Sequence, residues 1–330
     1  MTPQIIVWNA QGCGSNKFIR FAHQYIRDHH PDIFVFIETH ISGDLATRAI
    51  NALGFSNFFR VEAPGFSGGI WICWFDNVHD DVLLCLFQFI LCRITIPCSS
   101  TYCLVTFVYM SLNAHKRKAL WSYFRSFAHL ISEPWIIIRD FNATLYSSDR
   151  QGCVSSSKLD SNFQSLIFDC GLHDLGHNGP NFTWYKGSCA VRLDRGICNG
   201  AWLESFPASS IQHLLRMKSD HHPLMLTLVD LIPHFRPKFF RYFVRWIAHP
   251  DFNRLVHSRW DSSISLVYNV SHFSKAVDSW NSEVYGSIGK NKRSLMARLC
   301  GVQKCLAQQH TTNMLKLEFF LQRELELIFD

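Results

Sequence analysis

The sequence has few charges, no long apolar run and no paired cysteine motif. Charged residues make up 18% of its 330 residues, against roughly 25% in an average soluble domain. Its longest apolar run, residues 82–92, holds 11 residues and includes Gln88, whereas a membrane-spanning helix needs about 20. We therefore expect no membrane helix, and we interpret this run as a buried strand.

The cysteines and the N-terminus argue against two further classes of protein. None of the 12 cysteines belongs to a Cys-x-x-Cys pair, which is the usual signature of a structural zinc site. We expect free, buried thiols, as in proteins of a reducing compartment. Residues 1–7 contain neither a basic segment nor a long apolar one, so nothing there predicts secretion, and we expect an intracellular protein.

Apolar and aromatic residues are abundant, at 48% and 14% of the chain. A chain this apolar buries a core and is not disordered. The charge is unevenly distributed, since residues 1–230 contain 18 basic and 18 acidic residues and residues 231–330 contain 14 and 8. The whole excess of +6 thus lies in the last hundred residues. With Pro233 and Pro237 near the change, we predict two domains, residues 1–230 and residues 231–330.

Apolar runs of strand length alternate with segments of helical spacing through the first predicted domain. Continuous apolar runs indicate strands covered on both faces, and apolar residues three and four positions apart indicate amphipathic helices. Such alternation is typical of sheets covered by helices, an α/β architecture. We expect strands at residues 4–8, 33–37, 70–75, 82–96, 102–109, 135–138, 182–185, 191–197 and 224–229, and helices at residues 18–29, 116–131 and 158–170.

Helical spacing dominates the second predicted domain. Residues 293–330 repeat apolar residues at helical intervals, with Gly301 as a weak point. The pattern stops without a cap or breaker, so we expect a helical extension that continues into a longer protein. Residues 239–260 are aromatic and basic. They fit a helix that packs its Phe and Trp side chains better than a surface that stacks on nucleic acid.

Five polar clusters lie at or near the ends of apolar runs. In α/β folds such positions converge on one rim of a sheet, where functional sites form. Carboxylates are hard oxygen ligands that suit Mg²⁺, amides can orient a phosphate or a nucleophile, and histidine can act as acid, base or charge stabiliser. Taken singly, each cluster also fits an ordinary turn or strand end. The clusters are Asn9, Glu38-Thr39, Asp140-Phe141-Asn142, Asp194 and Ser219-Asp220-His221.

An ordered set of motifs extends this pattern along residues 4–229. Together they resemble the endonuclease/exonuclease/phosphatase superfamily, which has the deoxyribonuclease-I-like fold. Within it, residues 179–184 and 192–195 are most similar to endonuclease domains of plant LINE-type (non-LTR) retrotransposons, and residues 240–260 are similar to the linker before their reverse transcriptase. The motifs are Trp8-Asn9-Ala10-Gln11-Gly12, Glu38-Thr39, Tyr109, Asp140-Phe141-Asn142, Phe182-Thr183-Trp184, Arg192-Leu193-Asp194-Arg195 and Ser219-Asp220-His221-His222-Pro223.

The resemblance implies a fold and an activity. The fold is a four-layer α/β sandwich, in which two packed mixed sheets are flanked by helices, here with a C-terminal helical extension. The activity is hydrolysis of DNA phosphodiester bonds with Mg²⁺, for which Mn²⁺ can substitute. Glu38, Asp140 and Asp220 are then the expected metal ligands. DNA is the expected partner, the reverse transcriptase is missing from this chain, and an active protein would work in the nucleus.

The same resemblance assigns roles to the other site residues. Asp140 would activate the attacking water or assist the leaving oxygen, while Asn9 and Asn142 would orient nucleophile and phosphate. His221, held by Asp194, would stabilise charge on the phosphorane. Asp220 would contribute to the metal or water network. The residues expected to contact phosphate or DNA are Asn9, Tyr109, Thr183 and Ser219.

Two departures from the family pattern leave alternatives open. Arg139 stands where the family usually has glycine before Asp-Phe-Asn, so it either crowds the site or binds a phosphate. Ala10-Gln11 replaces the Cys-Arg of the plant elements and removes a cation. Neither change removes a catalytic residue, but a decayed remnant that folds without cleaving DNA is a second hypothesis. A phosphatase or phosphodiesterase acting on small or lipid phosphates is the third.

Overall fold

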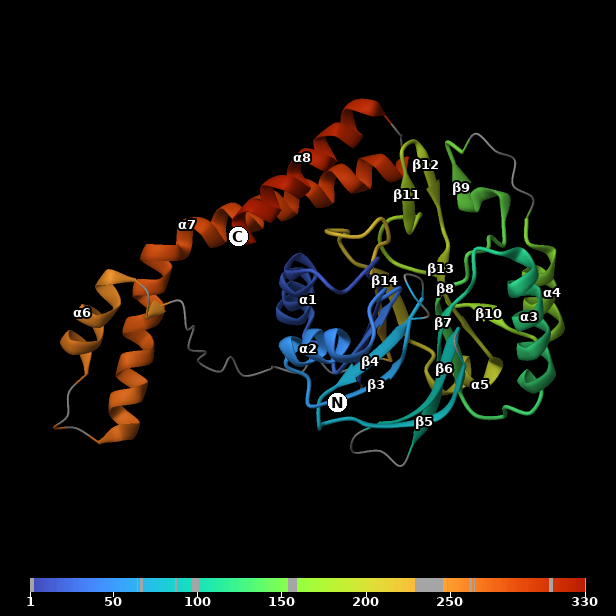
Figure 1. Cartoon of the computed structure of the whole chain (residues 1–330), viewed down its shortest axis with the longest axis horizontal. Helices are drawn as coiled ribbons and strands as arrows, with labels where there is room; N and C mark the ends of the chain where they lie inside the picture. Colours follow the sequence, from blue (N-terminus) through green and yellow to red (C-terminus); the bar gives the residue numbers. More distant parts are fainter. Residues whose placement is uncertain are drawn as a thin grey trace. The chain divides into compact units, whose positions relative to one another are not determined.

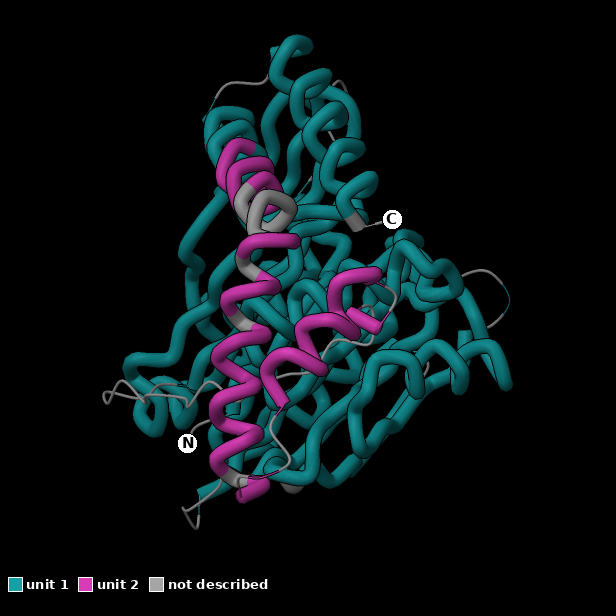
Figure 2. The backbone as a smooth tube through the Cα atoms, turned by 90° about the vertical axis from the view of Figure 1, so that its left-hand side faces the viewer, with its two compact units in different colours: residues 1–231, 299–329 teal, residues 232–298, 330 magenta. Residues whose placement is uncertain are grey.

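The computed structural model divides the chain into two compact units. It describes residues 3–63, 65, 68–86, 88–96, 101–153, 159–228, 246–247, 249–260, 263, 265–308 and 311–329. The first unit comprises residues 1–231 together with residues 299–329, and the second comprises residues 232–298 (Figure 2). The helix α7, Leu266–Gln308, begins in the second unit and ends in the first. Pro233 and Pro237 lie outside the described residues.

Two six-stranded sheets form the centre of the first unit (Figure 1). Their orders are β14-β15-β1-β2-β4-β3 and β10-β13-β8-β7-β6-β5, and a small third sheet has the order β11-β12-β9. Both large sheets are mixed, because β1 and β2 run parallel, as do β7 and β8, while their other neighbours are antiparallel. The strands are β1 Gln4–Asn9, β2 Ile33–Ile37, β3 Asn57–Val61, β4 Ile70–Trp74, β5 His79–Leu86, β6 Phe89–Thr95, β7 Tyr102–Tyr109, β8 Trp135–Asp140, β9 Arg150–Gln151, β10 His173–Asp174, β11 Trp184–Lys186, β12 Cys189–Val191, β13 Asp194–Cys198, β14 Ser210–His213 and β15 Leu224–Thr227.

Helices cover the outer faces of the two large sheets. Figure 1 shows α1 and α2 beside the sheet that contains β1 to β4, and α3 and α4 beside the sheet that contains β5 to β8. The four-layer α/β sandwich expected from the sequence is therefore confirmed. The helices of this unit are α1 Asn16–His29, α2 Gly43–Leu53, α3 Ala114–Ala128, α4 Ser161–Asp169, α5 Gly200–Ser205 and α8 Thr312–Phe329, with a 3₁₀ turn at Ser147–Asp149.

Alternation along the strands builds the layers. In β1, Ile5 and Val7 point into a core between the sheets that also holds alternate residues of β2, β4, β6, β7 and β8. Trp8 points to the other face, where its ring lies 5.1 Å from that of Tyr25 on α1. Because both faces are covered, the strands are continuously apolar. This pattern made β1 and β2 predictable to within one residue.

Two apolar runs that were expected to be single strands are divided in the structure. Residues 82–96 belong to the hairpin of β5 and β6, and residues 191–197 are shared by β12 and β13. Neither break contains proline or glycine, the residues that usually mark a turn in sequence. Six elements escaped prediction because their sequences are short or weakly apolar: α2, β3, β9, β10, α5 and β14.

One cysteine pair corrects the expectation of free thiols throughout. Cys153 and Cys189 form a disulfide. Strand β12 pairs with β9 so that Ala190 lies opposite Gln151, which brings the two cysteines together although they are 36 positions apart in the sequence. Nine other cysteines are free in the described part of the chain.

The C-terminal region is helical, as expected, but its helices have other limits. Helix α7 starts at Leu266 and continues through Gly301, and α8 follows at Thr312. In the second unit, α6, Pro250–Arg259, and α7 pack Trp246, Phe252 and Val277 into a small core, which favours the packing interpretation of the aromatic residues there. No described helix is long and apolar enough to cross a membrane.

Candidate active site

The ends of strands from both large sheets supply the candidate site. Asn9 is the last residue of β1 and lies opposite Ile37, after which comes Glu38. In the other sheet, Asp140 ends β8 and lies opposite Asp194, the first residue of β13. His221 follows a loop from β14 and forms a bridge with Trp184. The clusters found at the ends of apolar runs thus meet where the two sheets meet.

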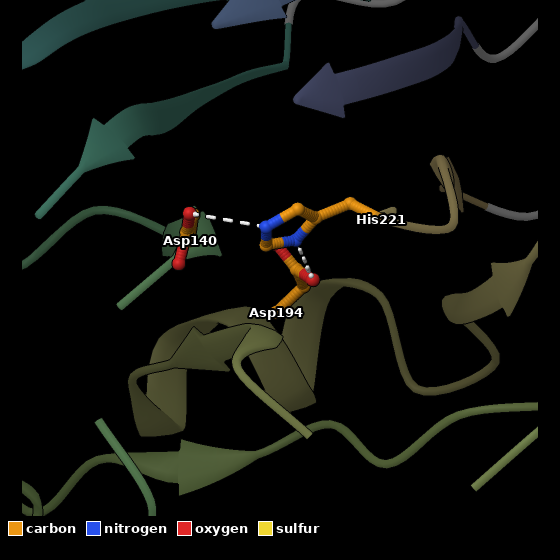
Figure 3. Close-up of side chains that lie close together, drawn as sticks. All are labelled: Asp140, Asp194 and His221. Carbon is orange, nitrogen blue, oxygen red and sulfur yellow. Dashed lines mark hydrogen bonds and ion pairs between the residues drawn. The ribbon is translucent and has the colours of Figure 1, made fainter. Parts of the chain in front are cut away.

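His221 lies between two buried aspartates (Figure 3). Its Nδ1 lies 2.9 Å from Oδ2 of Asp194 and its Nε2 lies 3.9 Å from Oδ2 of Asp140. Burial alone would lower the pKa of His221, but the charges of Asp194 and Asp140 reverse this and raise it to about 9. The imidazole is therefore a cation near neutral pH, which suits a group that stabilises negative charge on a phosphate.

Asp140 is fixed on both oxygens. The side-chain amide of Asn9 donates to Oδ2 at 3.1 Å, and the backbone N–H of Asn142 donates to Oδ1 at 3.0 Å. Burial raises the pKa of Asp140 to about 7; His221 opposes this rise, and the nearby charge of Asp194 adds to it. A carboxyl group with such a pKa can accept a proton at neutral pH, as a general base must.

Glu38 and Tyr109 form the next part of the site. Burial raises the pKa of Tyr109, and the charge of Glu38 and a hydrogen bond to its carboxylate raise it further. Nε2 of His40 lies 3.6 Å from Oε2 of Glu38. The backbone of Glu38 has φ = 54°, the left-handed region that non-glycine residues seldom adopt and that clusters at functional sites.

Asp220 and Ser219 complete the loop that carries His221. Oδ2 of Asp220 accepts a hydrogen bond from the indole N–H of Trp184 at 2.8 Å, and Oδ1 lies 3.9 Å from Nε2 of His221. The hydroxyl of Ser219 accepts from the backbone N–H of His221 at 3.1 Å. Ser219 therefore shapes the loop, and Asp220 faces the histidine.

Two other predicted residues are engaged with the protein itself. The buried hydroxyl of Thr183 accepts from the backbone N–H groups of Leu193 and Asp194, both at 3.0 Å. The side chain of Asn142 donates to the backbone oxygen of Met110 at 2.7 Å. Contact of these two residues with phosphate stays a prediction.

Arg139 points inward, and its guanidinium becomes part of the site. The side chain is fully buried, with Nε 3.3 Å from Oδ1 of Asp194 and Nη1 donating to the backbone oxygen of His222 at 2.8 Å. Burial would raise the pKa of Asp194, yet Arg139 and His221 hold it well below its usual value. Asp194 is thus ionised and shared between two cations.

Lys218 is a site residue that the sequence patterns did not reveal. Its Nζ donates to the backbone oxygens of Ala10, Gln11 and Gly12 at 2.5, 3.1 and 2.6 Å. The lysine therefore ties the loop after Asn9 to the loop that carries His221. Its position next to Ser219 was the only available signal, and a lysine beside a motif is too common to be informative.

The chemistry of the donor groups fits a divalent cation. Possible ligand atoms of Asp140, Asp194 and His221 lie within 4.8 Å of one another, but a cationic His221 has no free nitrogen lone pair for a metal, so the carboxylates are the groups that could bind it. Glu38 adds negative charge that acts on Asp140, so the site concentrates carboxylates in a buried place. Such concentration is unfavourable unless a cation compensates for it.

Comparisons with known proteins agree with this geometry. A telomere-specific non-LTR retrotransposon, TRAS1, has an endonuclease domain that matches with a TM-score of 0.53 and 13% identity, over 68% of this chain and 97% of that domain. The AP endonuclease LMAP from Leishmania major matches with a TM-score of 0.52 and 12% identity, over 68% and 87%. The 3' phosphatase NExo from Neisseria, bound to a product DNA hairpin, matches at 0.50 and 17%, over 68% and 98%.

At these identities the solved structures show a shared fold. No curated protein matches the chain. The sequence profile described as the endonuclease/exonuclease/phosphatase family matches residues 6–221, which include every strand-end cluster named above. Members of this family are hydrolases of phosphate esters, and the chain belongs to the endonuclease/exonuclease/phosphatase family.

Proposed function

We propose that the chain is a divalent-metal-dependent endonuclease that nicks DNA, with Mg²⁺ as its metal. The observation that carries this proposal is the arrangement around His221, where a cationic imidazole held by Asp194 faces a carboxyl group, Asp140, whose pKa is raised to about 7. A phosphodiester is an anion that repels nucleophiles, so its hydrolysis needs positive charge on one side and a base on the other. This arrangement supplies both.

Glu38, Asp140 and Asp220 are the residues that we expect to hold the metal. Asp194 belongs to the same cluster, but Arg139 and His221 already neutralise it. A bound Mg²⁺ would neutralise charge that develops on the phosphate oxygens. The oxygen ligands of the three chosen residues suit that ion, and Mn²⁺ has the same preference.

The protein side chains would then carry out the remaining tasks. Asp140, held by Asn9 and Asn142, accepts the proton of the attacking water or assists the leaving oxygen. His221 donates a hydrogen bond from Nε2 to a phosphate oxygen, while Nδ1 stays bound to Asp194 and so fixes the ring. Tyr109 supports Glu38 through their hydrogen bond.

A role in a retrotransposon is the finer part of the proposal. It is supported by the motifs at residues 179–184 and 192–195 and by the fold shared with the TRAS1 endonuclease domain. In such an element the nick would prime reverse transcription, and the enzyme would work in the nucleus on chromosomal DNA. The reverse transcriptase would lie in sequence outside this chain.

The test is nicking of supercoiled plasmid by the purified chain. With Mg²⁺ we expect nicking that Asp140→Ala and His221→Ala each reduce by about 10²-fold or more, and that chelation of the metal abolishes. Asp44→Ala, which changes an exposed carboxylate on α2, should leave the rate unchanged. Equal rates in parent and site variants would mean contamination and would refute the proposal.

A second substrate belongs in the same assay, because NExo, which shares this fold, is a 3' phosphatase. An oligonucleotide with a 3'-phosphate tests whether the site removes a terminal phosphate in preference to cutting an internal bond. Inositol phosphates test the small-phosphate hypothesis. A chain that is inactive on all three substrates with Mg²⁺ and Mn²⁺ would support the decayed remnant.

A further inference from the structure

Arg216 lies five residues before His221 and is held by side chains from the C-terminal helices. Gln303 lies near the end of α7 and Glu318 lies on α8, and both belong to the same compact unit as Arg216. All three residues are buried. Since the family match ends at residue 221, these contacts come from outside the matched region.

Gln303 binds the backbone of Arg216 on both sides. Its Oε1 accepts from the N–H of Arg216 at 3.2 Å, and its Nε2 donates to the carbonyl oxygen of Arg216 at 2.8 Å. A side-chain amide that pairs with both groups of one residue replaces the partner strand that the loop lacks. It fixes the backbone, since both groups are buried and have a strong requirement for partners.

Glu318 binds the side chain of the same residue. Its Oε1 accepts from Nη2 of Arg216 at 2.6 Å and from Nε2 of Gln303 at 2.8 Å. On its other side, the guanidinium lies over the ring of Tyr185, 4.6 Å from the ring centre. Both the backbone and the guanidinium of Arg216 are therefore held in place. An unpaired cation in this buried site would lower the stability of the fold.

Further hydrogen bonds hold the residues around Arg216 and between it and His221. Leu214 accepts a hydrogen bond from Nδ1 of His222 at 2.7 Å, and Leu215 accepts one from the hydroxyl of Tyr25 at 2.7 Å. With Lys218 bound to the loop after Asn9, the segment from Leu214 to His222 has an anchor at nearly every residue. Among these anchors, Gln303 and Glu318 come from α7 and α8, outside the sandwich.

We propose that Gln303 and Glu318 are positioning residues for the catalytic histidine. The end of α7 and α8, residues 299–329, would then be a working part of the active-site unit, because these helices hold the loop that places His221 against Asp194 and Asp140. The inference rests on the proposed function for the reaction that His221 serves. The anchoring of the loop itself can be measured without any reaction.

The experiment measures the loop directly and then the rate, in the full chain. In Gln303→Ala we expect backbone amides of residues 214–222 to exchange with deuterium at least about tenfold faster than in the parent, while amides of β1 and β7 keep their rates. If the parent nicks DNA, we expect kcat to fall about 10- to 100-fold, since small misplacement of a catalytic group has effects of that size. KM should change less than about twofold.

Matched variants separate positioning from stability. Glu318→Gln keeps an oxygen that can accept both hydrogen bonds but removes the negative charge beside Arg216. It should therefore lower stability and still restore most of the rate lost in Glu318→Ala at temperatures where the chain is folded. Leu321→Ala removes a fully buried contact of α8 and should lower stability without lowering kcat at temperatures where the chain is folded. Glu326→Gln, in the half-buried ion pair with Lys17 on α1, should have no effect on kcat.

Two results would overturn the inference. One is unchanged exchange of residues 214–222 in Gln303→Ala, which would show that the helices do not hold the loop. The other is a loss of kcat in Leu321→Ala as large as in Gln303→Ala, which would mean that stability alone matters. If the parent does not cleave DNA, the proposed function fails while the exchange measurement still decides the anchoring.

Discussion

At the scale of single residues, Arg139 combines a fully buried guanidinium with an unusual backbone conformation. Its backbone has φ = 116°, a conformation that glycine adopts readily and that other residues adopt only under strain. The resemblance to the family, which usually has glycine here, left two alternatives for Arg139, that it crowds the site or that it binds a phosphate. The structure adds a backbone reason for the usual glycine, since any side chain at this position is strained whatever space surrounds it.

The strain at Arg139 can be measured by comparing two substitutions. Arg139→Gly and Arg139→Ala both remove the guanidinium, so the difference between them reports the backbone alone. We expect the glycine variant to have the larger free energy of unfolding, by about 1–2 kcal/mol, in urea denaturation. At Gln212, an exposed residue of β14 with no positive φ, the order should reverse because alanine is then favoured. If the glycine variant were the more stable one at both positions, the claim of backbone strain at Arg139 would be contradicted.

Two buried histidines of the site region are neutral. Nδ1 of His222 donates to the backbone oxygen of Leu214, and Nδ1 of His213 donates to that of Pro180, both at 2.7 Å. Burial lowers the pKa of His222 to about 3, and burial likewise lowers that of His213 well below its usual value. In contrast, the pKa of His221 is raised to about 9. The adjacent residues His221 and His222 are therefore cationic and neutral, respectively, near neutral pH.

The neutral histidines make stability depend on pH. Below pH 6.5 the unfolded chain protonates His222, whereas the folded chain does not until about pH 3. The unfolded state then binds more protons, so the free energy of unfolding should fall as the pH falls through this window, by up to about 1.4 kcal/mol per pH unit. His222→Asn keeps a donor for Leu214 and should show a smaller slope in denaturation between pH 6.5 and 4. Equal slopes would contradict a neutral His222.

At the residue scale, much of the candidate site was predictable from sequence. Asn9, Glu38 and Asp140 follow directly from the rule that strand ends share a rim, because each lies at or beside the end of an apolar run. Asp194 lay inside the run 191–197, and it is a strand end because the structure divides that run between β12 and β13. The sequence did not predict that Arg139 would bind Asp194, and it gave no role to Lys218. Their roles depend on where a long side chain turns, which a one-dimensional pattern does not encode.

At the scale of elements, the small sheet β11-β12-β9 has a covalent link as well as hydrogen bonds. The disulfide between Cys153 and Cys189 joins β12 to the end of β9. Strand β11 of the same sheet begins with Trp184, which binds Asp220. The sheet therefore contacts the loop that carries His221 through this indole and through the backbone of β11.

Reduction should destabilise the first unit measurably. A disulfide that closes a loop of about 36 residues stabilises by roughly 3–4 kcal/mol in the chain-entropy account. We expect dithiothreitol to lower the midpoint of urea unfolding for the parent. It should leave the midpoint of the Cys153→Ser/Cys189→Ser variant unchanged. An equal response of both proteins would contradict the bond. Reduction of the parent should also release two further titratable thiols, those of Cys153 and Cys189.

The elements that sequence predicted well are those with strong periodicity. Strand β2 was predicted to the residue and α1 to within two residues, because aromatic and aliphatic side chains cover one face or both. The hairpin of β5 and β6 was merged into one run, since its apolar character continues through the turn. Short elements such as α5 and β14 depend on tertiary contacts, and no local pattern identifies them.

At the scale of the whole molecule, the active-site unit is discontinuous in sequence. Residues 299–329 return to the unit that residues 1–231 form. The returning helices bury Leu299, Leu306, Leu321 and Leu325 completely. Sequence could not predict this, because an amphipathic helix shows that it has an apolar face but not which partner covers that face.

The discontinuity predicts that a cut chain stays together. If a protease recognition sequence replaces residues 261–264, cleavage gives two fragments, and we expect them to elute as one species in gel filtration. The buried leucines and the Arg216–Glu318 pair should hold the C-terminal fragment. Leu306→Asp combined with Leu321→Asp should release it. Separation of the unsubstituted fragments in native buffer would contradict the docking.

The anchored arginine also has a practical consequence for anyone who produces this protein in recombinant form. The family match suggests an expression boundary soon after residue 221. A protein that ends there would leave the guanidinium of Arg216 without its carboxylate partner, Glu318. It would also expose to solvent the apolar side chains that the last helices cover. Poor yield and aggregation would then be mistaken for an intrinsic defect of a degenerate gene, although the missing last helices would be their cause.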